Sequence, residues 1–212
     1  MQTLRIGLDF DGVIAASMEQ HAEAYRQALA PLGVEVSDED VFCREGARSE
    51  TIIRDLTPGL QVDAASLADE KQRLFRALGP VSMYPGAVAL VRSLQETLPV
   101  ALVTGTRRAN LEALIPDLLP GFGAVMSQEY YTHDKPHPEP YQRAAEALGI
   151  EASQLICVEN AMRGVQSAKA AGYGAVVGIT TTQTPEMLHE ADHIIHDHAA
   201  LGTILAELLQ RI

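Results

Sequence analysis

Residues 4–13 read LRIGLDFDGV, and this stretch constrains how the rest of the chain can fold. Residues 4–8 form a short run of mainly apolar side chains, which is typical of a strand buried on both faces of a parallel sheet. Two acids, Asp9 and Asp11, follow the run directly and are separated by one residue. Ligands of open α/β sheets bind beyond the carboxyl ends of the strands. We therefore expect the functional site at Asp9 and Asp11.

Further segments share the character of residues 4–8. They are brief, rich in β-branched or aliphatic side chains, and bounded by polar or glycine-containing turns: residues 100–103, 155–158 and 175–179. Segments with the apolar spacing of helices lie between them: residues 87–96, 141–148 and 162–171. This alternation predicts βαβ units. The fold class that we expect is α/β, with a doubly wound, Rossmann-like parallel sheet.

One long segment breaks the alternation, because from Ser17 to about Leu78 the pattern is helical almost throughout. Breaks at residues 31–33 (PLG) and 57–59 (TPG) divide it into separate helices. The helices are predicted over residues 18–32, 38–42, 49–55 and 64–78. We therefore predict two domains: an all-helical domain over residues 16–81, inserted after the first strand, and an α/β core formed by residues 1–15 and 82–212.

The composition restricts the kinds of partner. The 212-residue chain has 16 Lys+Arg against 28 Asp+Glu, a formal net charge of -12. Nucleic acids and anionic membranes require a cationic face, so we expect neither as a partner. An anionic small molecule must instead be met by locally placed cations or by a metal ion. The composition alone leaves a monomer and a homodimer equally open.

The cellular location is predicted from the lack of a disulfide pattern, of a signal peptide and of a membrane-spanning segment in the sequence. Cys43 and Cys157 fit no disulfide framework. The first twelve residues carry charges every few positions and lack the apolar core of a signal peptide. Apolar runs are far shorter than the roughly 20 residues that cross a bilayer. We expect a cytoplasmic protein.

The spacing of Asp9 and Asp11 has a chemical consequence. Two carboxylates this close are stable together only beside a cation, and Mg²⁺ takes oxygen ligands and shares its site with phosphate oxygens. One aspartate can then act as nucleophile and the other as general acid and base. Gly12 permits a sharp turn that brings main-chain N–H groups toward a phosphate. The competing interpretation is a DxD pattern that only caps a helix, but the strand before it favours the functional one.

The segment DFDGV (residues 9–13) resembles the first motif of the haloacid dehalogenase superfamily of phosphotransferases. The helical insert resembles the cap of the branch that contains phosphoglycolate phosphatase and β-phosphoglucomutase. Four motifs occur in the family's order over nearly the whole chain. The resemblance implies that Asp9 forms an aspartyl-phosphate and binds the metal. It also implies that Asp11 protonates the leaving group, activates water, and gives its main-chain carbonyl to the metal.

Two further segments resemble the second and third motifs. Residues 100–106 (VALVTGT) form a strand that ends in Thr104 and Gly105, whose hydroxyl and N–H groups would hold a phosphoryl oxygen. Residues 134–141 (DKPHPEPY) place Lys135 before a proline-rich turn, where it would contact Asp9 and the phosphoryl group. The competing interpretations are a turn-capping threonine and a solvated lysine. We expect His133 and His137 to be loop residues, since Mg²⁺ prefers oxygen ligands.

The segment ICVENAMRGV (residues 156–165) resembles the fourth motif but departs from it. Relatives usually carry two adjacent acids where this chain has Glu159 and Asn160. Asn160 can offer a carbonyl oxygen to the metal without adding charge, so Glu159 is expected to be the more important acidic ligand. Capping of the following helix is the competing role for Asn160.

The helical insert supplies the predicted substrate contacts. His21 and Tyr25 are one turn apart and therefore lie on one face of a helix. Arg48, in a glycine-containing loop, could grip a second anionic group, and Lys71 is a further candidate. For each residue the alternative is ordinary surface exposure.

The predicted function is Mg²⁺-dependent hydrolysis of a small phosphorylated metabolite, such as phosphoglycolate or a sugar phosphate, by a phosphoric monoester hydrolase. The alternative is a sugar phosphomutase, since His21 and Lys71 resemble positions of β-phosphoglucomutase. A non-catalytic module that binds phosphate esters is a third hypothesis, supported only by Asn160.

Overall fold

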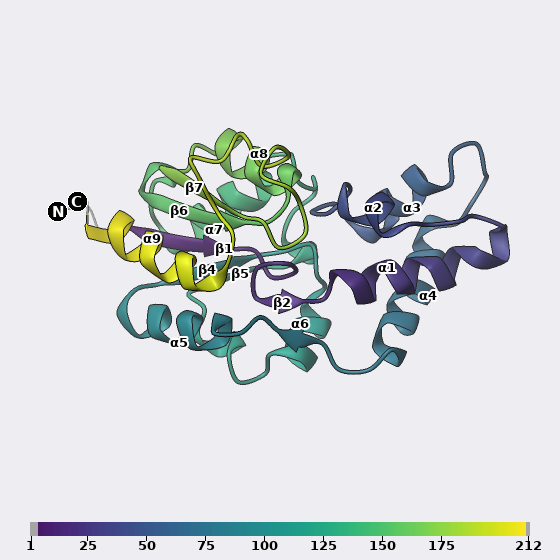
Figure 1. Cartoon of the computed structure of the whole chain (residues 1–212), viewed down its shortest axis with the longest axis horizontal. Helices are drawn as coiled ribbons and strands as arrows, with labels where there is room; N and C mark the ends of the chain where they lie inside the picture. The colour runs from purple at the N-terminus through teal and green to yellow at the C-terminus, as the bar shows by residue number, and fades with distance from the viewer. Residues whose placement is uncertain (1–3, 211–212) are drawn as a thin grey trace.

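The computed structural model describes residues 4–210, so the ends of the predicted core, 1–3 and 211–212, lie outside the described residues. Six strands form one sheet in the order β5-β4-β1-β6-β7-β8, and every pair is parallel (Figure 1). The strands are β1 (Arg5–Leu8), β4 (Val100–Val103), β5 (Ala124–Met126), β6 (Leu155–Glu159), β7 (Ala175–Ile179) and β8 (His193–Ile195). The predicted doubly wound α/β class is confirmed, with β1 and its acids in the middle of the sheet.

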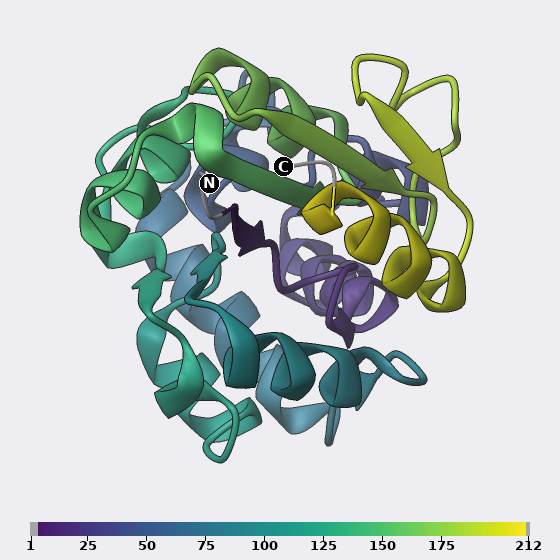
Figure 2. The same ribbon diagram turned by 90° about the vertical axis from the view of Figure 1, so that its left-hand side faces the viewer.

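Helices cover both faces of the sheet (Figure 2). Successive strand side chains point to opposite faces, so each strand contributes to two separate cores. Ile6 and Leu8 face α5 (Ala87–Thr97) and α9 (His198–Gln210), and α6 (Arg108–Leu114) packs into the same cluster. Cys157 faces the other cluster, which contains α7 (Glu139–Leu148) and α8 (Met162–Ala170). Burial on both faces explains why the strands read as continuous apolar runs.

Four helices form a second body beside the carboxyl ends of the strands (Figure 1). They are α1 (Met18–Leu29), α2 (Asp38–Phe42), α3 (Ser49–Leu56) and α4 (Ala64–Ala77). Their buried side chains, Leu29 and Ile53 among them, form a cluster of their own. Two short antiparallel strands, β2 (Ala15–Ala16) and β3 (Ser82–Met83), join this body to the sheet. We propose residues 16–81 as a cap domain and the remainder as the core.

The helix ends follow local sequence signals. Ser37 and Asp40 form a capping box at the start of α2, in which each side chain bonds the other residue's backbone N–H. α7 ends at Gly149, whose φ of 67° lies in the left-handed region that favours glycine. Short 3-10 segments connect the longer elements: Ala30–Leu32, Leu119–Gly121, Gln128–Tyr130 and Ala152–Gln154. No helix between residues 4 and 210 is long and apolar enough to span a membrane.

Three features were not predicted from the sequence: β5, α6 and the β2–β3 pair. β5 has three residues, and β2 and β3 have two each, so none is long enough to show a period. β5 becomes a strand because its backbone pairs with β4 at Leu102 and its neighbours. β2 pairs with β3 across the whole inserted domain. Backbone partners distant in the sequence, rather than a local pattern, therefore define these three strands.

Candidate active site

A cavity of about 70 Å³ lies between the carboxyl edge of the sheet and the cap. Core and cap both line it, and seven predicted site residues are in its wall: Asp9, Asp11, His21, Tyr25, Lys71, Thr104 and Gly105. Lys135, Glu159 and Asn160 are buried and directly or indirectly bonded to Asp9. The predicted catalytic residues therefore converge from four distant segments on one site.

Lys135 organises the core side of the site. Its side chain is 0% exposed, and its ammonium group donates to Asp9 Oδ1 at 3.0 Å and Glu159 Oε1 at 2.6 Å. A third bond goes to the carbonyl of Val103 at the end of β4, at 2.9 Å. Burial by itself lowers the pKa of Lys135, but the two carboxylates raise it more, to above the usual lysine value. Lys135 is therefore a fixed cation that connects three strands.

Asp9 lies at the end of β1, and its second oxygen, Oδ2, is not among the atoms that Lys135 contacts. Burial raises the pKa of the Asp9 carboxyl, Lys135 lowers it, and Glu159 and Asp11 raise it again, with a net value of about 8. Lys135 alone therefore does not keep Asp9 ionised at neutral pH. A further cation beside Asp9 would favour the carboxylate that a nucleophile requires.

The carboxylate of Glu159 is occupied on both oxygens. Oε1 accepts from Lys135 and from the hydroxyl of Tyr141 at 2.7 Å. Oε2 accepts from the backbone N–H groups of Asn160 and Ala161 at 3.2 and 3.4 Å. This arrangement favours a supporting role, in which Glu159 orients Lys135, over the predicted role of principal acidic metal ligand.

Asn160 presents an oxygen without a partner. Its side chain is buried, and Oδ1 has no hydrogen-bond partner among the described residues. A buried unpaired carbonyl is costly and marks a place where a water or an ion binds. Gly12 has a φ of 78°, and a Cβ atom there would lie 1.9 Å from the Asn160 amide nitrogen. Gly12 therefore lets Asn160 approach the β1 loop, and the residues present fit a hard cation with oxygen ligands.

Asp11 is turned toward the connection with the cap. Oδ1 accepts from the Ser17 hydroxyl at 2.5 Å and lies 3.2 Å from His21 Nε2, and Oδ2 accepts from Thr106 at 2.5 Å. Burial opposes ionisation, but His21 and the two hydroxyl groups hold the pKa of Asp11 well below its ordinary value. The pKa of Asp11 is therefore lowered whereas that of Asp9, two residues away, is raised, because hydrogen-bond donors surround the Asp11 carboxylate.

Lys71 and His21 extend this network into the cap. Lys71 Nζ lies 2.7 Å from His21 Nδ1, and His21 Nε2 faces Asp11. His21 stacks on Phe75, and Lys71 Nζ lies 4.6 Å from the centre of the Tyr25 ring. Burial is the main cause that lowers the pKa of both His21 and Lys71, the latter to about 7. Both predicted cap residues line the cavity, but each already has a partner.

Thr104 and Gly105 end β4 as predicted. Thr104 is buried, and its hydroxyl oxygen accepts from the backbone N–H of Thr106 at 3.0 Å. Gly105 lies under the cap loop, since a Cβ atom there would lie 3.6 Å from the carbonyl of Ala47. The cap loop therefore covers the strand end where a phosphoryl group is expected.

Arg48, predicted to contact the substrate, is not in the wall of the cavity. Its Nε lies 2.9 Å from Asp134 Oδ1, and its backbone N–H donates to the same carboxylate at 3.0 Å. The guanidinium group also donates to the carbonyls of Gln128 and Tyr131. Arg48 therefore fastens the cap to the core loop that precedes Lys135.

Several site residues were missed in the sequence. Ser17 and Thr106 hold Asp11, Glu45 is buried against Asn160, and the cavity wall also contains Gln72, Arg107 and Gln128. Thr106 follows Thr104 by two residues and could have been found from the strand-end position. The others sit in helical or loop segments whose residue types carry no special pattern.

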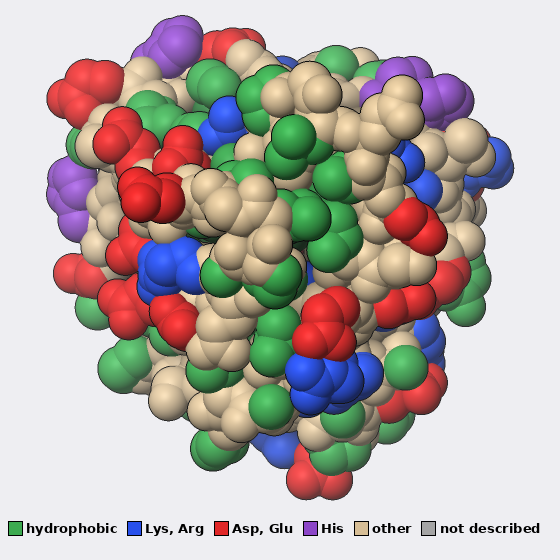
Figure 3. Space-filling model, turned by 90° about the vertical axis from the view of Figure 1, so that its right-hand side faces the viewer, with side chains coloured by type: hydrophobic (Ala, Val, Ile, Leu, Met, Phe, Trp, Pro, Cys, Tyr) green, Lys and Arg blue, Asp and Glu red, His purple; other side chains and the backbone are tan. Residues whose placement is uncertain are grey.

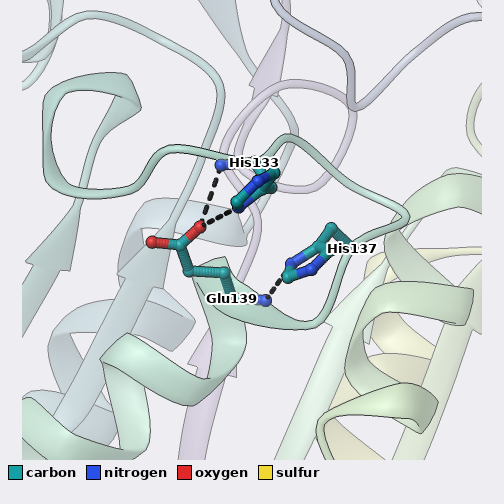
Figure 4. A group of neighbouring side chains, drawn as sticks. All are labelled: His133, His137 and Glu139. Atoms are coloured by element: carbon teal, nitrogen blue, oxygen red, sulfur yellow. Dashed lines mark hydrogen bonds and ion pairs between the residues drawn. The ribbon is translucent and has the colours of Figure 1, made fainter.

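A cluster of two histidines and a glutamate lies outside the cavity (Figure 4). The rings of His133 and His137 stack with centres 4.4 Å apart, and Glu139 accepts from the ring and the backbone of His133. Both histidines are exposed, as their predicted loop role requires.

On the face of the molecule in Figure 3, Lys and Arg side chains are scattered among Asp and Glu.

Comparison with known proteins places this geometry in a family. The profile of the haloacid dehalogenase-like hydrolases matches residues 6–178. The fructose-1-phosphate phosphatase YqaB of Escherichia coli is 30% identical over 79% of this chain and 92% of its own. The validoxylamine A 7'-phosphate phosphatase of Streptomyces hygroscopicus is 29% identical, over 89% of this chain and 91% of its own.

Among solved structures, a β-phosphoglucomutase from Clostridium difficile superposes with a TM-score of 0.83 at 18% identity, over 99% of this chain and 97% of its own. This likeness concerns the fold. The two phosphatases agree with the expected class, a phosphoric monoester hydrolase. The chain belongs to the haloacid dehalogenase-like hydrolases.

Proposed function

We propose that this protein is a Mg²⁺-dependent phosphatase that hydrolyses a small phosphorylated sugar or related polyol through an aspartyl-phosphate on Asp9. The observation that carries the proposal is the pairing of Asp9 Oδ1 with the buried cation Lys135, at the cavity wall and beside Thr104. One carboxylate oxygen is thereby held in place while the other is left to attack a phosphoryl group.

The first step forms a bond between Asp9 and phosphorus and breaks the ester bond to the leaving oxygen. The pKa of Asp11 is held low, so Asp11 first receives a proton from the Lys71–His21 pair and then delivers it to the leaving oxygen. In the second step Asp11 takes a proton from water, which attacks the same phosphorus, and returns that proton to the Lys71–His21 pair. Asp9 and inorganic phosphate are released.

Positive charge and hydrogen-bond donors stabilise the transferring group. The hydroxyl of Thr104 and the N–H groups around Gly105 line the cavity and would contact phosphoryl oxygens, while Lys135 contributes its positive charge through Asp9. Asp9, the main-chain carbonyl of Asp11 and the free Asn160 Oδ1 would hold Mg²⁺, with Glu159 in support through Lys135. When bound, the ion supplies charge that keeps Asp9 ionised and neutralises the phosphoryl oxygens.

The cap wall favours hydroxyl-bearing substrates over small carboxylates. Gln72 is buried in the cavity wall, and its amide Nε2 has no hydrogen-bond partner among the described residues. The cations in the cavity wall are engaged: Lys71 of the cap by His21, and Arg107 of the core by Asp69 at 2.6 Å. An unpaired amide donor suits a hydroxyl or carbonyl oxygen. We therefore favour a sugar phosphate over phosphoglycolate, whose carboxylate would need a free cation.

The mutase alternative requires a place for a second phosphate. The cap arginine that could have bound it, Arg48, is bonded to Asp134 instead. This observation favours hydrolysis. Any Mg²⁺-dependent turnover would in turn exclude the non-catalytic binding module.

The test is a panel of phosphorylated metabolites and p-nitrophenyl phosphate, assayed for released phosphate with Mg²⁺ and with EDTA. Activity is expected with Mg²⁺ and sugar phosphates, and Asp9→Asn is expected to lower kcat by about 10⁴-fold or more, since the nucleophile is lost. Turnover retained by Asp9→Asn would reject the nucleophile assignment. Phosphate transfer within a sugar bisphosphate pool, without release, would favour the mutase.

A further inference from the structure

The core of this site is short of negative charge for a divalent ion. Asn160 is neutral, each oxygen of Glu159 already accepts two hydrogen bonds, and Oδ1 of Asp9 is bonded to Lys135. Divalent cations in phosphoryl-transfer sites are held by carboxylates together with substrate oxygens. The described core residues thus offer an unpartnered amide oxygen where a second carboxylate would be expected.

A carboxylate from the cap lies at this position. Glu45 stands in the loop between α2 and α3 and is only 4% exposed. Its Oε1 accepts from Asn160 Nδ2 at 2.6 Å, and its Oε2 accepts from the Thr182 hydroxyl at 2.7 Å. Both partners are neutral, and no ion pair within residues 4–210 includes Glu45. Each oxygen of Glu45 accepts only one hydrogen bond, and burial raises the pKa of this carboxyl well above its ordinary value, so a cation beside it would be needed to keep it ionised.

The place of Glu45 depends on contacts between cap and core on both sides of it. On one flank, the Gln183 side chain donates to the carbonyl of Phe42 at 2.7 Å. On the other, Arg48 pairs with Asp134. Opening of the cap would therefore withdraw Glu45 from Asn160, whereas Asp9 and Asn160 would remain on the core.

We propose that Glu45 is a metal ligand carried by the cap, which supplies the charge that Asn160 lacks and couples Mg²⁺ binding to cap closure. The inference rests on the proposed Mg²⁺ dependence of the enzyme. An ion that binds better when Glu45 is in place must favour the closed cap by the same free energy, because linkage is reciprocal. Cap closure then completes the metal site and not only the substrate cavity.

The first test measures the Kd of MgCl2 by titration calorimetry, without substrate. Glu45→Gln keeps the shape of the side chain and removes its charge, and is expected to weaken binding by about 10- to 100-fold. Relocating the acid in Glu45→Gln/Asn160→Asp is expected to restore the Kd to within about threefold, since the charge count returns. Glu39→Gln, which removes an exposed carboxylate of α2 in the same cap, is the matched control and should leave the Kd unchanged.

The second test distinguishes coupling between Mg²⁺ binding and cap closure from a simple effect of the Glu45 charge on Mg²⁺ affinity. Arg48→Ala loosens the cap without touching Asn160, and is expected to weaken Mg²⁺ binding by about fivefold or more when Glu45 is the ligand. In the Glu45→Gln/Asn160→Asp background, where the acid is on the core, the same substitution should have no effect on the Kd. Circular dichroism and thermal unfolding in EDTA check that each variant is folded.

The inference is overturned if Glu45→Gln binds Mg²⁺ within about twofold of the wild type, or if Arg48→Ala weakens binding equally in both backgrounds. A wild-type enzyme that hydrolyses phosphate esters with Mg²⁺ in either case would leave the proposed function standing. A wild-type protein that neither binds Mg²⁺ nor hydrolyses phosphate esters would reject both.

Discussion

Two lysines lie buried near the cavity, Lys135 in the core behind Asp9 and Lys71 in the wall that the cap forms. Lys135 has two carboxylates within 3.0 Å, and they raise its pKa. Lys71 has a histidine and aromatic rings around it, and burial lowers its pKa to about 7. The same residue type is thus a permanent cation in the core and a titrating group in the cap. In the core, charged groups bind one another as ion pairs, whereas in the cap the lysine and histidine are linked by a hydrogen bond and can exchange a proton.

The largest expected contrast is in stability. Lys135→Met should lower the free energy of unfolding by about 3–5 kcal/mol, because Asp9 and Glu159 would remain buried without a cation. Lys71→Met should change it by no more than about 1 kcal/mol, since no carboxylate loses its partner. Urea unfolding in EDTA at pH 7 measures both.

Lys169→Met is the control for these variants, since Lys169 forms a half-exposed ion pair with Asp192. A loss within about 0.5 kcal/mol is expected for it. Similar losses for Lys135→Met and Lys71→Met would contradict the distinction between the two lysines.

The pH dependence sharpens the comparison. Lys71 titrates near pH 7 when folded and near the ordinary value of 10.5 when unfolded. Between these values the unfolded chain binds more protons, so the contribution of Lys71 to stability rises with pH, by at most about 1.4 kcal/mol per unit. Lys135 has a raised pKa, so its contribution is fully present up to about pH 10 and is lost only above that.

Wild type and Lys71→Met should therefore diverge by about 1–2 kcal/mol in favour of the wild type between pH 7.5 and 9. The difference between wild type and Lys135→Met should widen over the same range, because without Lys135 the buried Asp9 keeps its proton to higher pH than in the wild type, where its pKa is about 8. Urea unfolding at the two pH values, in matched ionic strength, gives both differences. A level difference for Lys71→Met would show that Lys71 does not titrate in this range.

The smallest expected effect concerns the cap wall alone. Gln72→Leu removes the unpaired amide of the cavity and should raise KM for a sugar phosphate about fivefold more than for p-nitrophenyl phosphate. The reason is that the aryl phosphate has no hydroxyl group for the amide to recognise. Steady-state kinetics with both substrates measures the ratio, and equal changes would remove Gln72 from substrate recognition.

The core residues of the site were predictable because each follows a recognisable feature of the sequence. Asp9 and Thr104 end apolar strands, and Lys135 precedes a proline-rich turn. Parallel strands bring such ends to one edge of the sheet, so position along the chain translates into position in space. Short elements such as β5 escaped prediction, because three residues contain no period.

The cap residues were less predictable, because their roles depend on partners far along the chain. Arg48 was expected to bind an anion of the substrate, but its carboxylate partner is Asp134, 86 residues away. Glu45 lies in the same cap loop, which was expected to face the substrate, but its contact with Asn160, 115 residues away, was not predicted. Neither pairing produces a periodic pattern or a motif in the sequence from which it could be predicted.

The sequence by itself determined the order of strands and helices, the helical insert, and the four segments that meet at the edge of the sheet. These follow from local periodicity and from the rule that parallel strands share one carboxyl edge. Only the tertiary structure decided which carboxylate oxygens are already occupied, that Glu159 supports Lys135, and that Glu45 meets Asn160. The physical reason is that charge and hydrogen-bond satisfaction depend on atoms from distant segments, which no local pattern specifies.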